Sequence, residues 1–175
     1  RRFNGTVFQF YCTDHNTWET CPVTGGHTAQ AAPAAVVSSS IYAGRLYMWC
    51  TSDYIHYDGT TTWVMSHTPA ILGTFATEFD GNLVKITAGG VMTYGTDPEA
   101  ASPTWTALTT VRDDTPTSIC VYKNGSGDPA IYVGTTRGPY VIDFANKKVY
   151  KTQIRFSDNH ADNCRAMGTW NSDLV

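Results

Sequence analysis

The sequence predicts an all-β protein, and its composition and patterning lead to this fold class. Charged residues make up only 15% of the 175 residues, and aromatic residues make up 13%, whereas an ordinary soluble domain carries about 25% charged residues. The only glutamates are Glu19, Glu78 and Glu99, although helix surfaces are normally rich in this residue. Short runs of alternating apolar and polar residues, rich in Thr, Val, Tyr and Trp and separated by glycine-containing turns, recur along the chain, as in half-buried strands.

An internal repeat of about 44 residues organises these runs. Trp18, Trp63 and Trp105 each follow a threonine, in "NTWETCPV", "TTWVMSHT" and "PTWTALTT", at intervals of 45 and 42 residues. A fourth copy, "KKVYKTQI", has Val149 in the tryptophan position, 44 residues further on. Upstream, "GRLYMWCTSDYIHYDG" (44–59) aligns with "GNLVKITAGGVMTYGT" (81–96) and "PAIYVGTTRGPYVIDF" (129–144). We therefore interpret these four positions as structural positions of a repeat.

Each complete copy contains four short runs that we predict to be antiparallel strands, called a, b, c and d in chain order. Turn dipeptides such as Asp80-Gly81 and Asn124-Gly125 separate them. The predicted strands lie at roughly 36–42, 45–51, 54–57 and 62–66, then at roughly 74–79, 83–88, 91–94 and 104–109, and finally at roughly 117–122, 130–135, 139–144 and 148–154.

Four antiparallel strands in every forty to forty-five residues are typical of the blades of a β-propeller. We predict one propeller domain, or part of one, over 1–175. It would comprise a half blade at 1–30 with only the c and d strands, blades at about 34–67, 72–110 and 115–154, and a half blade at 160–175. Either the two halves complete one another and close a four-bladed ring, or the chain is a segment of a larger ring. The second arrangement is favoured because larger rings are common.

The composition and motifs disfavour several classes of function. The net charge is -3 and there is no basic stripe, so sequence-specific binding of nucleic acid is not expected. The longest bland run, "AQAAPAAVV", is too short for membrane insertion. The chain contains no G-x-S-x-G elbow, phosphate-binding loop or H-E-x-x-H motif. We therefore expect a protein that is not an enzyme and carries no cofactor.

One segment is rich in oxygen ligands. "SDNHADN" (157–163) holds Asp158, His160 and Asp162, and such groups can bind calcium. The residue order of a calcium loop is absent, and Asx-rich segments commonly form turns, so no metal site is predicted.

The five cysteines are an odd number and match no zinc-binding spacing. Cys12 and Cys21 would face each other on a hairpin centred near Asn16 and Thr17. In an oxidising compartment they could form a disulfide. The alternative is that they are buried free thiols.

The predicted topology places the d–a and b–c loops at one face of the propeller. Basic and acidic side chains are mixed there, which suits contact with another protein; the alternative interpretation is the ordinary polarity of loops. The residues of this predicted contact face are Asp53, Arg112, Asp113, Asp114, Arg137, Asp158, His160 and Asp162.

The stretch "DGTTTW" (58–63) resembles a degenerate Asp-box of the sialidase kind, S/T-x-D-x-G-x-T-W. Asp58, Thr62 and Trp63 match this motif, whereas His56 and Thr60 depart from it. The resemblance implies a c–d turn that stabilises a blade without taking part in chemistry. Comparison with the other copies of the repeat separately predicts that Trp63 packs between blades. Sialidase catalysis would require an arginine cluster and a tyrosine–glutamate pair, which cannot be assigned here, so glycosidase activity is disfavoured.

In composition and repeat, the chain is similar to bacteriophage virion proteins, which include propeller-bearing tail components such as the nozzle proteins of short-tailed phages. The resemblance implies a structural or assembly protein of the virion, homo-oligomeric and in contact with other protein subunits. Two alternatives stay open. One is a secreted or surface binding propeller, lectin-like or receptor-like and extracellular. The other is a propeller enzyme whose catalytic residues lie outside this segment.

Overall fold

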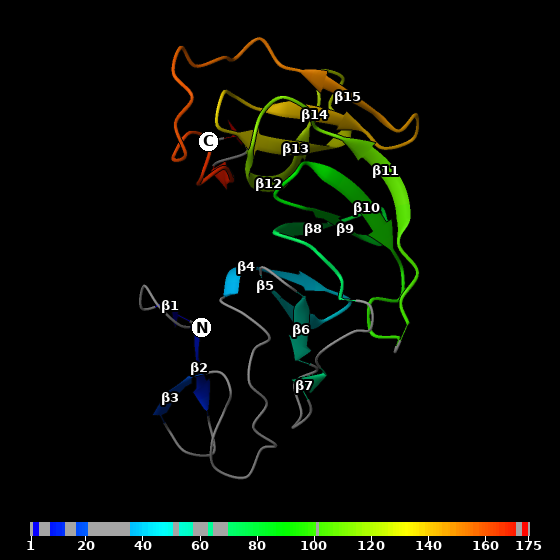
Figure 1. Ribbon diagram of the computed structural model, residues 1–175, viewed down its shortest axis with the longest axis vertical. Helices are drawn as coiled ribbons and strands as arrows, with labels where there is room; N and C mark the ends of the chain where they lie inside the picture. Colours follow the sequence, from blue (N-terminus) through cyan, green and yellow to red (C-terminus); the bar gives the residue numbers. More distant parts are fainter. Residues whose placement is uncertain are drawn as a thin grey trace. The chain divides into compact units, whose positions relative to one another are not determined.

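The computed structural model consists of antiparallel β-strands joined by turns (Figure 1). The chain divides into two compact units, Arg1–Gly73 and Thr74–Val175. In the part of the chain that the structure describes, no helix is long and apolar enough to span a membrane. The described residues are 2–3, 8–12, 17–20, 36–50, 53–57, 63–64, 70–100, 102–170 and 173–174, with side chains described at 36–50, 53–56, 70–100 and 102–168.

The first unit contains a three-stranded and a four-stranded sheet, each with its strands in chain order. The first sheet comprises β1 (Arg2–Phe3), β2 (Phe8–Cys12) and β3 (Thr17–Thr20). The second comprises β4 (Val36–Tyr42), β5 (Arg45–Cys50), β6 (Tyr54–Tyr57) and β7 (Trp63–Val64). The N-terminal half blade was predicted to hold two strands; the structure adds β1, whose two residues pair with Gln9 and Phe8 of β2.

The inner strands of the four-stranded sheet are buried on both faces. Met48 and Trp49, which are successive residues of β5 and so point to opposite faces, have no exposed surface. The indole Nε1 of Trp49 donates a hydrogen bond to Ser40 Oγ at 2.9 Å, so burial leaves this donor satisfied.

The second unit contains two four-stranded sheets and a short hairpin. The first sheet comprises β8 (Phe75–Phe79), β9 (Asn82–Ile86), β10 (Val91–Gly95) and β11 (Thr106–Thr110). The second comprises β12 (Pro116–Lys123), β13 (Pro129–Thr135), β14 (Tyr140–Asp143) and β15 (Lys148–Lys151), and the hairpin comprises β16 (Thr169–Trp170) and β17 (Asp173–Leu174). The predicted sets of four antiparallel strands are therefore confirmed, and such sheets are consistent with propeller blades.

The fourth strand of the last sheet is shorter than expected. The sequence predicts a strand to about residue 154, but β15 ends at Lys151. Thr152 bonds to the carbonyl oxygen of Pro139 through both its backbone N–H, at 3.2 Å, and its hydroxyl, at 2.9 Å. The segment from 153 to 168 then continues in bends and turns.

The repeat positions have equivalent places in the pairing register. In each four-stranded sheet, one residue of the b strand occupies the same position in the repeat alignment and pairs with a residue of the c strand. Two positions after that c-strand residue lies the residue opposite the repeat residue of the d strand. These b-strand residues are Met48, Lys85 and Val133, and their c-strand partners are Ile55, Thr93 and Tyr140. The repeat residues lie opposite Tyr57 (Trp63), Gly95 (Trp105, next to the Tyr94–Thr106 pair) and Ile142 (Val149), and Trp18 pairs with Tyr11 of the first sheet.

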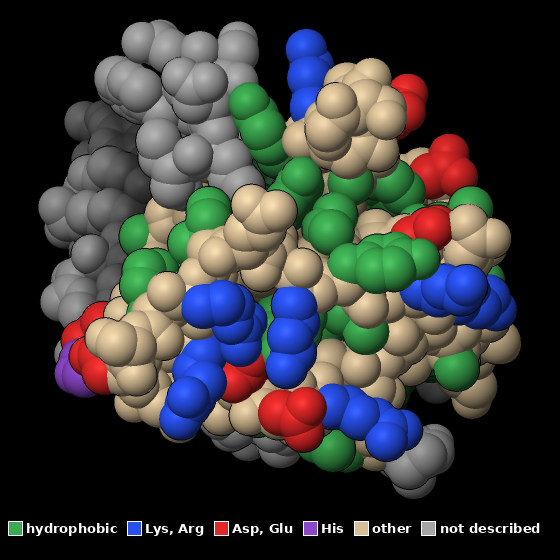
Figure 2. Space-filling view, turned by 90° about the horizontal axis from the view of Figure 1, so that it is seen from above, with side chains coloured by type: hydrophobic (Ala, Val, Ile, Leu, Met, Phe, Trp, Pro, Cys, Tyr) green, Lys and Arg blue, Asp and Glu red, His purple; other side chains and the backbone are tan. Residues whose placement is uncertain are grey.

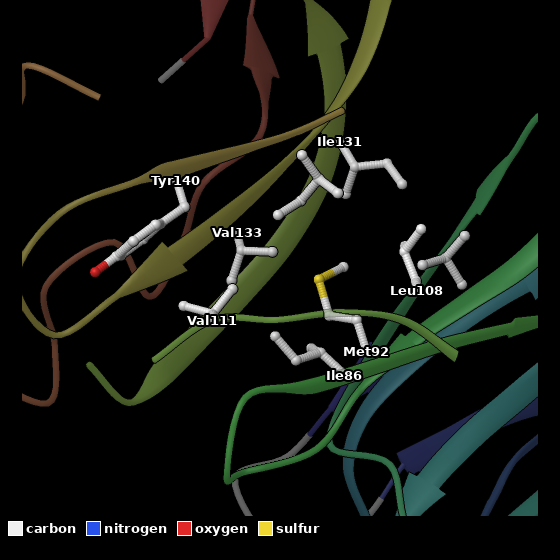
Figure 3. Close-up of a cluster of buried hydrophobic side chains, with 9 residues drawn as sticks. Ile86, Met92, Leu108, Val111, Ile131, Val133 and Tyr140 are labelled. Carbon is white, nitrogen blue, oxygen red and sulfur yellow. The ribbon is translucent and has the colours of Figure 1, made fainter. Parts of the chain in front are cut away.

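The two large sheets of the second unit pack face to face around one hydrophobic core (Figure 3). Side chains alternate between the two faces of a strand, so every second residue of the inner strands enters this core. Val149 of β15 packs against its edge. The first sheet and the residue after it contribute Val84, Ile86, Met92, Leu108 and Val111, and the second sheet contributes Ile131, Val133, Tyr140 and Ile142.

We expect Met92→Ala to lower the free energy of unfolding by about 2–5 kcal/mol, because it removes buried methylene groups and leaves a cavity. Met92 has no exposed surface, whereas its neighbour Val91 is 47% exposed. Val91→Thr keeps the β-branched shape and should change stability by only about 0.5 kcal/mol. Urea unfolding followed by tryptophan fluorescence measures both values. Equal effects would contradict the assignment of Met92 to the core.

Candidate functional site

Seven of the eight residues of the predicted contact face belong to the second unit. Arg112, Asp113 and Asp114 lie in the loop between β11 and β12, and Arg137 lies in the turn between β13 and β14. The segment after β15 carries the remaining three, Asp158, His160 and Asp162.

The eighth residue, Asp53, belongs to the first unit, where it precedes β6. Its carboxylate accepts a hydrogen bond from the backbone N–H of Tyr54 at 2.8 Å. Local backbone bonding therefore accounts for the position of this side chain.

Asp114 is the centre of a charge network at this end of the second unit. Its side chain is only 2% exposed and lies 2.6 Å from Nη2 of Arg155. The hydroxyl of Tyr140 donates a hydrogen bond to the same carboxylate at 2.5 Å. Arg137 approaches the other carboxylate oxygen at 3.8 Å, and the Arg155 guanidinium lies 5.2 Å from the centre of the Tyr140 ring. Lysine and arginine side chains lie beside acidic ones on the surface shown in Figure 2.

This network keeps Asp114 ionised and Tyr140 protonated. Burial alone would raise the pKa of Asp114, but hydrogen bonds from Tyr140 and Arg155 and the charges of Arg155 and Lys151 outweigh it, so the pKa lies below the ordinary 3.8. Burial, together with the hydrogen bond to Asp114, raises the pKa of Tyr140 to about 12. Neither group would exchange a proton near neutral pH, which suits a structural contact better than acid–base catalysis.

Backbone contacts hold the segment after β15 across the same end. The backbone N–H groups of Phe156 and His160 donate to the carbonyl oxygens of Arg137 and Thr136, at 3.0 and 3.3 Å. The Asn163 amide donates to Thr136 at 2.8 Å. Further along, the hydroxyls of Thr117 and Ser118, at the start of β12, donate to the carbonyls of Asn163 and Cys164. The segment is therefore fastened to the sheet by backbone and side-chain bonds.

Within "SDNHADN" the polar groups bond to one another. The Asp162 backbone N–H donates to Nδ1 of His160 at 3.2 Å, and the Asp162 carboxylate pairs with Arg165 at 2.9 Å. Asp158 contributes its carbonyl oxygen to the Asn163 amide at 3.1 Å. Across the described residues, no group of three or more His, Cys, Asp or Glu side chains is placed to hold a metal ion.

Many of the charged side chains at this end thus form ion pairs with one another within the chain. The structure brings together Asp114 with Arg137 and His160 with Asp162. It adds Arg155, which the sequence analysis did not select although the position lies in the loop assigned to this face. Arg112 and Asp113 are exposed and stay available to a partner.

The opposite end of the second unit contains a cavity that the sequence analysis did not predict. Its volume is about 970 Å³, and the a–b and c–d turns surround it. We call it the acidic groove. Its apolar wall includes Phe79, Val121, Ile142, Phe144 and Tyr150, and its carboxylates are Glu78, Asp80, Asp128 and Asp143.

The aromatic wall of the acidic groove comes from both large sheets. The Phe144 ring lies 5.3 Å from that of Phe79 and 4.9 Å from that of Tyr94, between ring centres. Such tilted pairs are favourable. Because these residues are far apart in sequence, the only available signal was an acidic residue at successive a–b and c–d turns.

Two predicted features fall partly or wholly outside the described residues. The first is the possible disulfide, because Cys21 and the side chain of Cys12 are not described. The second is the Asp-box, because residues 58–62 and the side chain of Trp63 are not described. Among the described cysteines, Cys120 and Cys164 are free thiols.

Comparisons with known proteins support the fold class. No family model matches the chain, and no curated protein matches its sequence. The chain is similar to the extracellular domain of BT4673 of B. thetaiotaomicron, named as a hybrid two component system, with 16% identity and a TM-score of 0.51 over 73% of this chain. This chain spans only 17% of the length of that one. The computationally designed protein Ika4 is similar at 12% identity and a TM-score of 0.57, with 87% of this chain and 90% of Ika4 covered. At these identities the similarity concerns the fold alone.

We expect Asp114→Asn to lower the free energy of unfolding by about 1–3 kcal/mol near neutral pH, as for a buried group that loses charged partners. Because the pKa is lower in the folded chain, the stabilisation is present above the ordinary pKa of 3.8 and is lost as the pH falls through the folded-state value. Denaturant unfolding of both proteins across this range should show their curves converging in acid.

Asp162→Asn is the matched control, because Asp162 is 63% exposed and its partner Arg165 is 73% exposed. An exposed pair contributes about 0–1 kcal/mol. A difference for Asp114→Asn that persists unchanged below the folded-state pKa would show that the charge network is not its source.

Proposed function

We propose that the chain forms part of a β-propeller and serves as a non-enzymatic structural or assembly protein. The order of the strands supports the propeller. In each four-stranded sheet the strands follow one another in chain order, and the two large sheets of the second unit share a core. Propeller blades have this arrangement and depend on their neighbours for burial. Three four-stranded sheets with one common pairing register are more than a chance series of hairpins would provide.

The face of the β12–β15 sheet that lies opposite the core is a second argument for a propeller, because a further blade could pack against it. The register places Tyr122 and Tyr132 on the face opposite the core, away from the residues that line the acidic groove. The chain runs from β15 towards this face.

Gly134 lies where the chain meets that face. A methyl group at Gly134 would lie 2.7 Å from Cβ of Cys164, so glycine allows the returning chain to approach closely. The β16–β17 hairpin that follows would then begin the next blade.

The proposed setting is the tail of a bacteriophage virion. The resemblance in composition and repeat supports it, and so does the internal use of charge around Asp114, which stabilises the loops without providing a catalytic group. In this setting the partners would be other protein subunits, including further copies of this chain.

The face-to-face core of the sheets is the observation that carries the structural role. We expect the chain to occur in several symmetric copies in purified virions of the phage that encodes it. Peptide mass spectrometry would give the copy number relative to the major capsid protein, and electron cryomicroscopy should resolve rings of four-stranded sheets. The absence of the chain from virions would contradict the proposal.

A second candidate is an extracellular binding propeller, and the acidic groove favours it. Grooves lined by aromatic side chains with a few polar groups are typical of ligand sites. In this case the isolated protein should bind particular structures on a glycan array. A protein that is folded by circular dichroism and binds no glycan would remove the lectin-like form of this candidate.

A further inference from the structure

We propose that the acidic groove docks a basic segment of a partner protein, whose lysine or arginine side chains reach its carboxylates while their stems lie on the aromatic wall. The groove lies within the second unit, at the end opposite the predicted contact face. The inference does not depend on the virion setting, because a basic segment could belong to a neighbouring subunit or to another partner.

The shape of the groove suits a peptide segment. Its volume of about 970 Å³ lies near the top of the range of about 300–1,000 Å³ for ligand sites. Tyr150 in its wall is 48% exposed, and Phe79 and Phe144 are half-buried. Aliphatic stems of lysine and arginine pack well on such surfaces, and their charged ends are attracted to aromatic faces.

The charge of the groove selects a cation. Among the described residues that line the groove, the charged ones are Glu78, Asp80, Asp128 and Asp143. In the described part of the chain, no lysine or arginine forms an ion pair with any of these four. Three of them are exposed, and Asp143 is half-buried. Electrostatic complementarity therefore favours a positively charged partner.

Tight turns fix the backbone positions of Asp80 and Asp128. Asp80 has a φ of 50°, and its carbonyl oxygen accepts a hydrogen bond from the Asn82 amide at 2.7 Å. The side chain of Asn124 accepts hydrogen bonds from the backbone N–H groups of Ser126 and Asp128, at 2.9 and 3.0 Å. Rigid turns of this kind reduce the entropy that is lost on binding.

Asp143 is held by its own turn, where its carboxylate accepts hydrogen bonds from the backbone and side chain of Asn146, at 3.0 and 2.8 Å. These bonds lower its pKa, as does Lys148 nearby. Lys147, on the same turn, is directed at the Tyr94 ring, 5.8 Å from its centre. Lys147 and Lys148 lie on the same turn as Asp143, so their positive charge reduces the attraction of Asp143 for a basic segment. Asp80 and Asp128, on the a–b turns, should therefore attract such a segment most strongly.

A protein segment fits this arrangement better than a metal ion or a nucleic acid. A calcium site needs several oxygen ligands that converge within about 2.6 Å of one point, and the described residues contain no group of three or more His, Cys, Asp or Glu side chains placed to hold a metal ion. Here the carboxylates come from separate turns, with apolar side chains between them. A nucleic acid would be repelled by the same charges.

The test uses the full chain and a fluorescein-labelled peptide that alternates arginine and lysine with leucine. Fluorescence polarisation at low ionic strength should show saturable binding that weakens with added salt. Asp80→Asn and Asp128→Asn should each weaken binding by about fivefold, the effect of one exposed ion pair, and the double variant by about 20-fold. Tyr150→Ser should weaken it further, because it removes part of the aromatic wall.

Asp97→Asn is the matched control, because Asp97 is exposed in the same unit but does not line the groove. It should leave peptide binding unchanged. A similar loss for Asp97→Asn would overturn the proposal in favour of general charge attraction, and so would absence of binding in the wild-type chain. Circular dichroism checks that each variant is folded.

A titration with calcium chloride, followed by calorimetry, tests whether the groove binds a metal ion in place of a basic peptide. Calcium binding that depends on Asp80 and Asp128, without peptide binding, would overturn the proposal and assign a cation site. None of these outcomes depends on whether the chain is found in virions, so failure of this inference is distinct from failure of the proposed function.

Discussion

Burial of aliphatic side chains between successive four-stranded sheets is the interaction on which the rest of the second unit depends. One face of each sheet supplies half of the core, and no sheet of this size could bury its apolar face alone. The core-facing residues of the inner strands are therefore apolar, and most charged side chains of this unit lie in turns and loops, although the buried Lys85 lies within β9. This constraint explains both the low overall charge of the chain and the concentration of its polar chemistry in loops.

The two ends of the second unit use that chemistry differently. At one end, the buried Asp114 is paired with Arg155 and bonded to Tyr140, and the chain after β15 is fastened over the loops. At the other end, Asp80 and Asp128 stand at the rim of a groove without a described basic partner. Charged loop residues thus stabilise the fold at one end, through the ion pair of Asp114 with Arg155. At the other end, Asp80 and Asp128 remain exposed to a cation.

The strands could be predicted from the sequence because alternation and turn dipeptides are local signals. A two-residue strand such as β1 carries too little alternation to be recognised, and no local pattern marks the end of β15 at Lys151. The structure places seven of the predicted contact-face residues in loops of the second unit, and the sequence did not indicate which of them pair. Asp114 and Arg155 are separated by 41 positions, and no local pattern relates them. The acidic groove was missed for the same reason, since its wall combines turns from two sheets.

The shared pairing register has a consequence for how such a chain evolves. Because Trp63, Trp105 and Val149 occupy the same place in their sheets, each repeat presents comparable faces to the repeats before and after it. Duplication or loss of one unit by unequal recombination would join faces that already fit. The replacement of tryptophan by valine at position 149 shows that the backbone pairing tolerates drift in the side chain. The number of repeats would then be a property that selection can change in whole steps, while the two loop ends diverge independently.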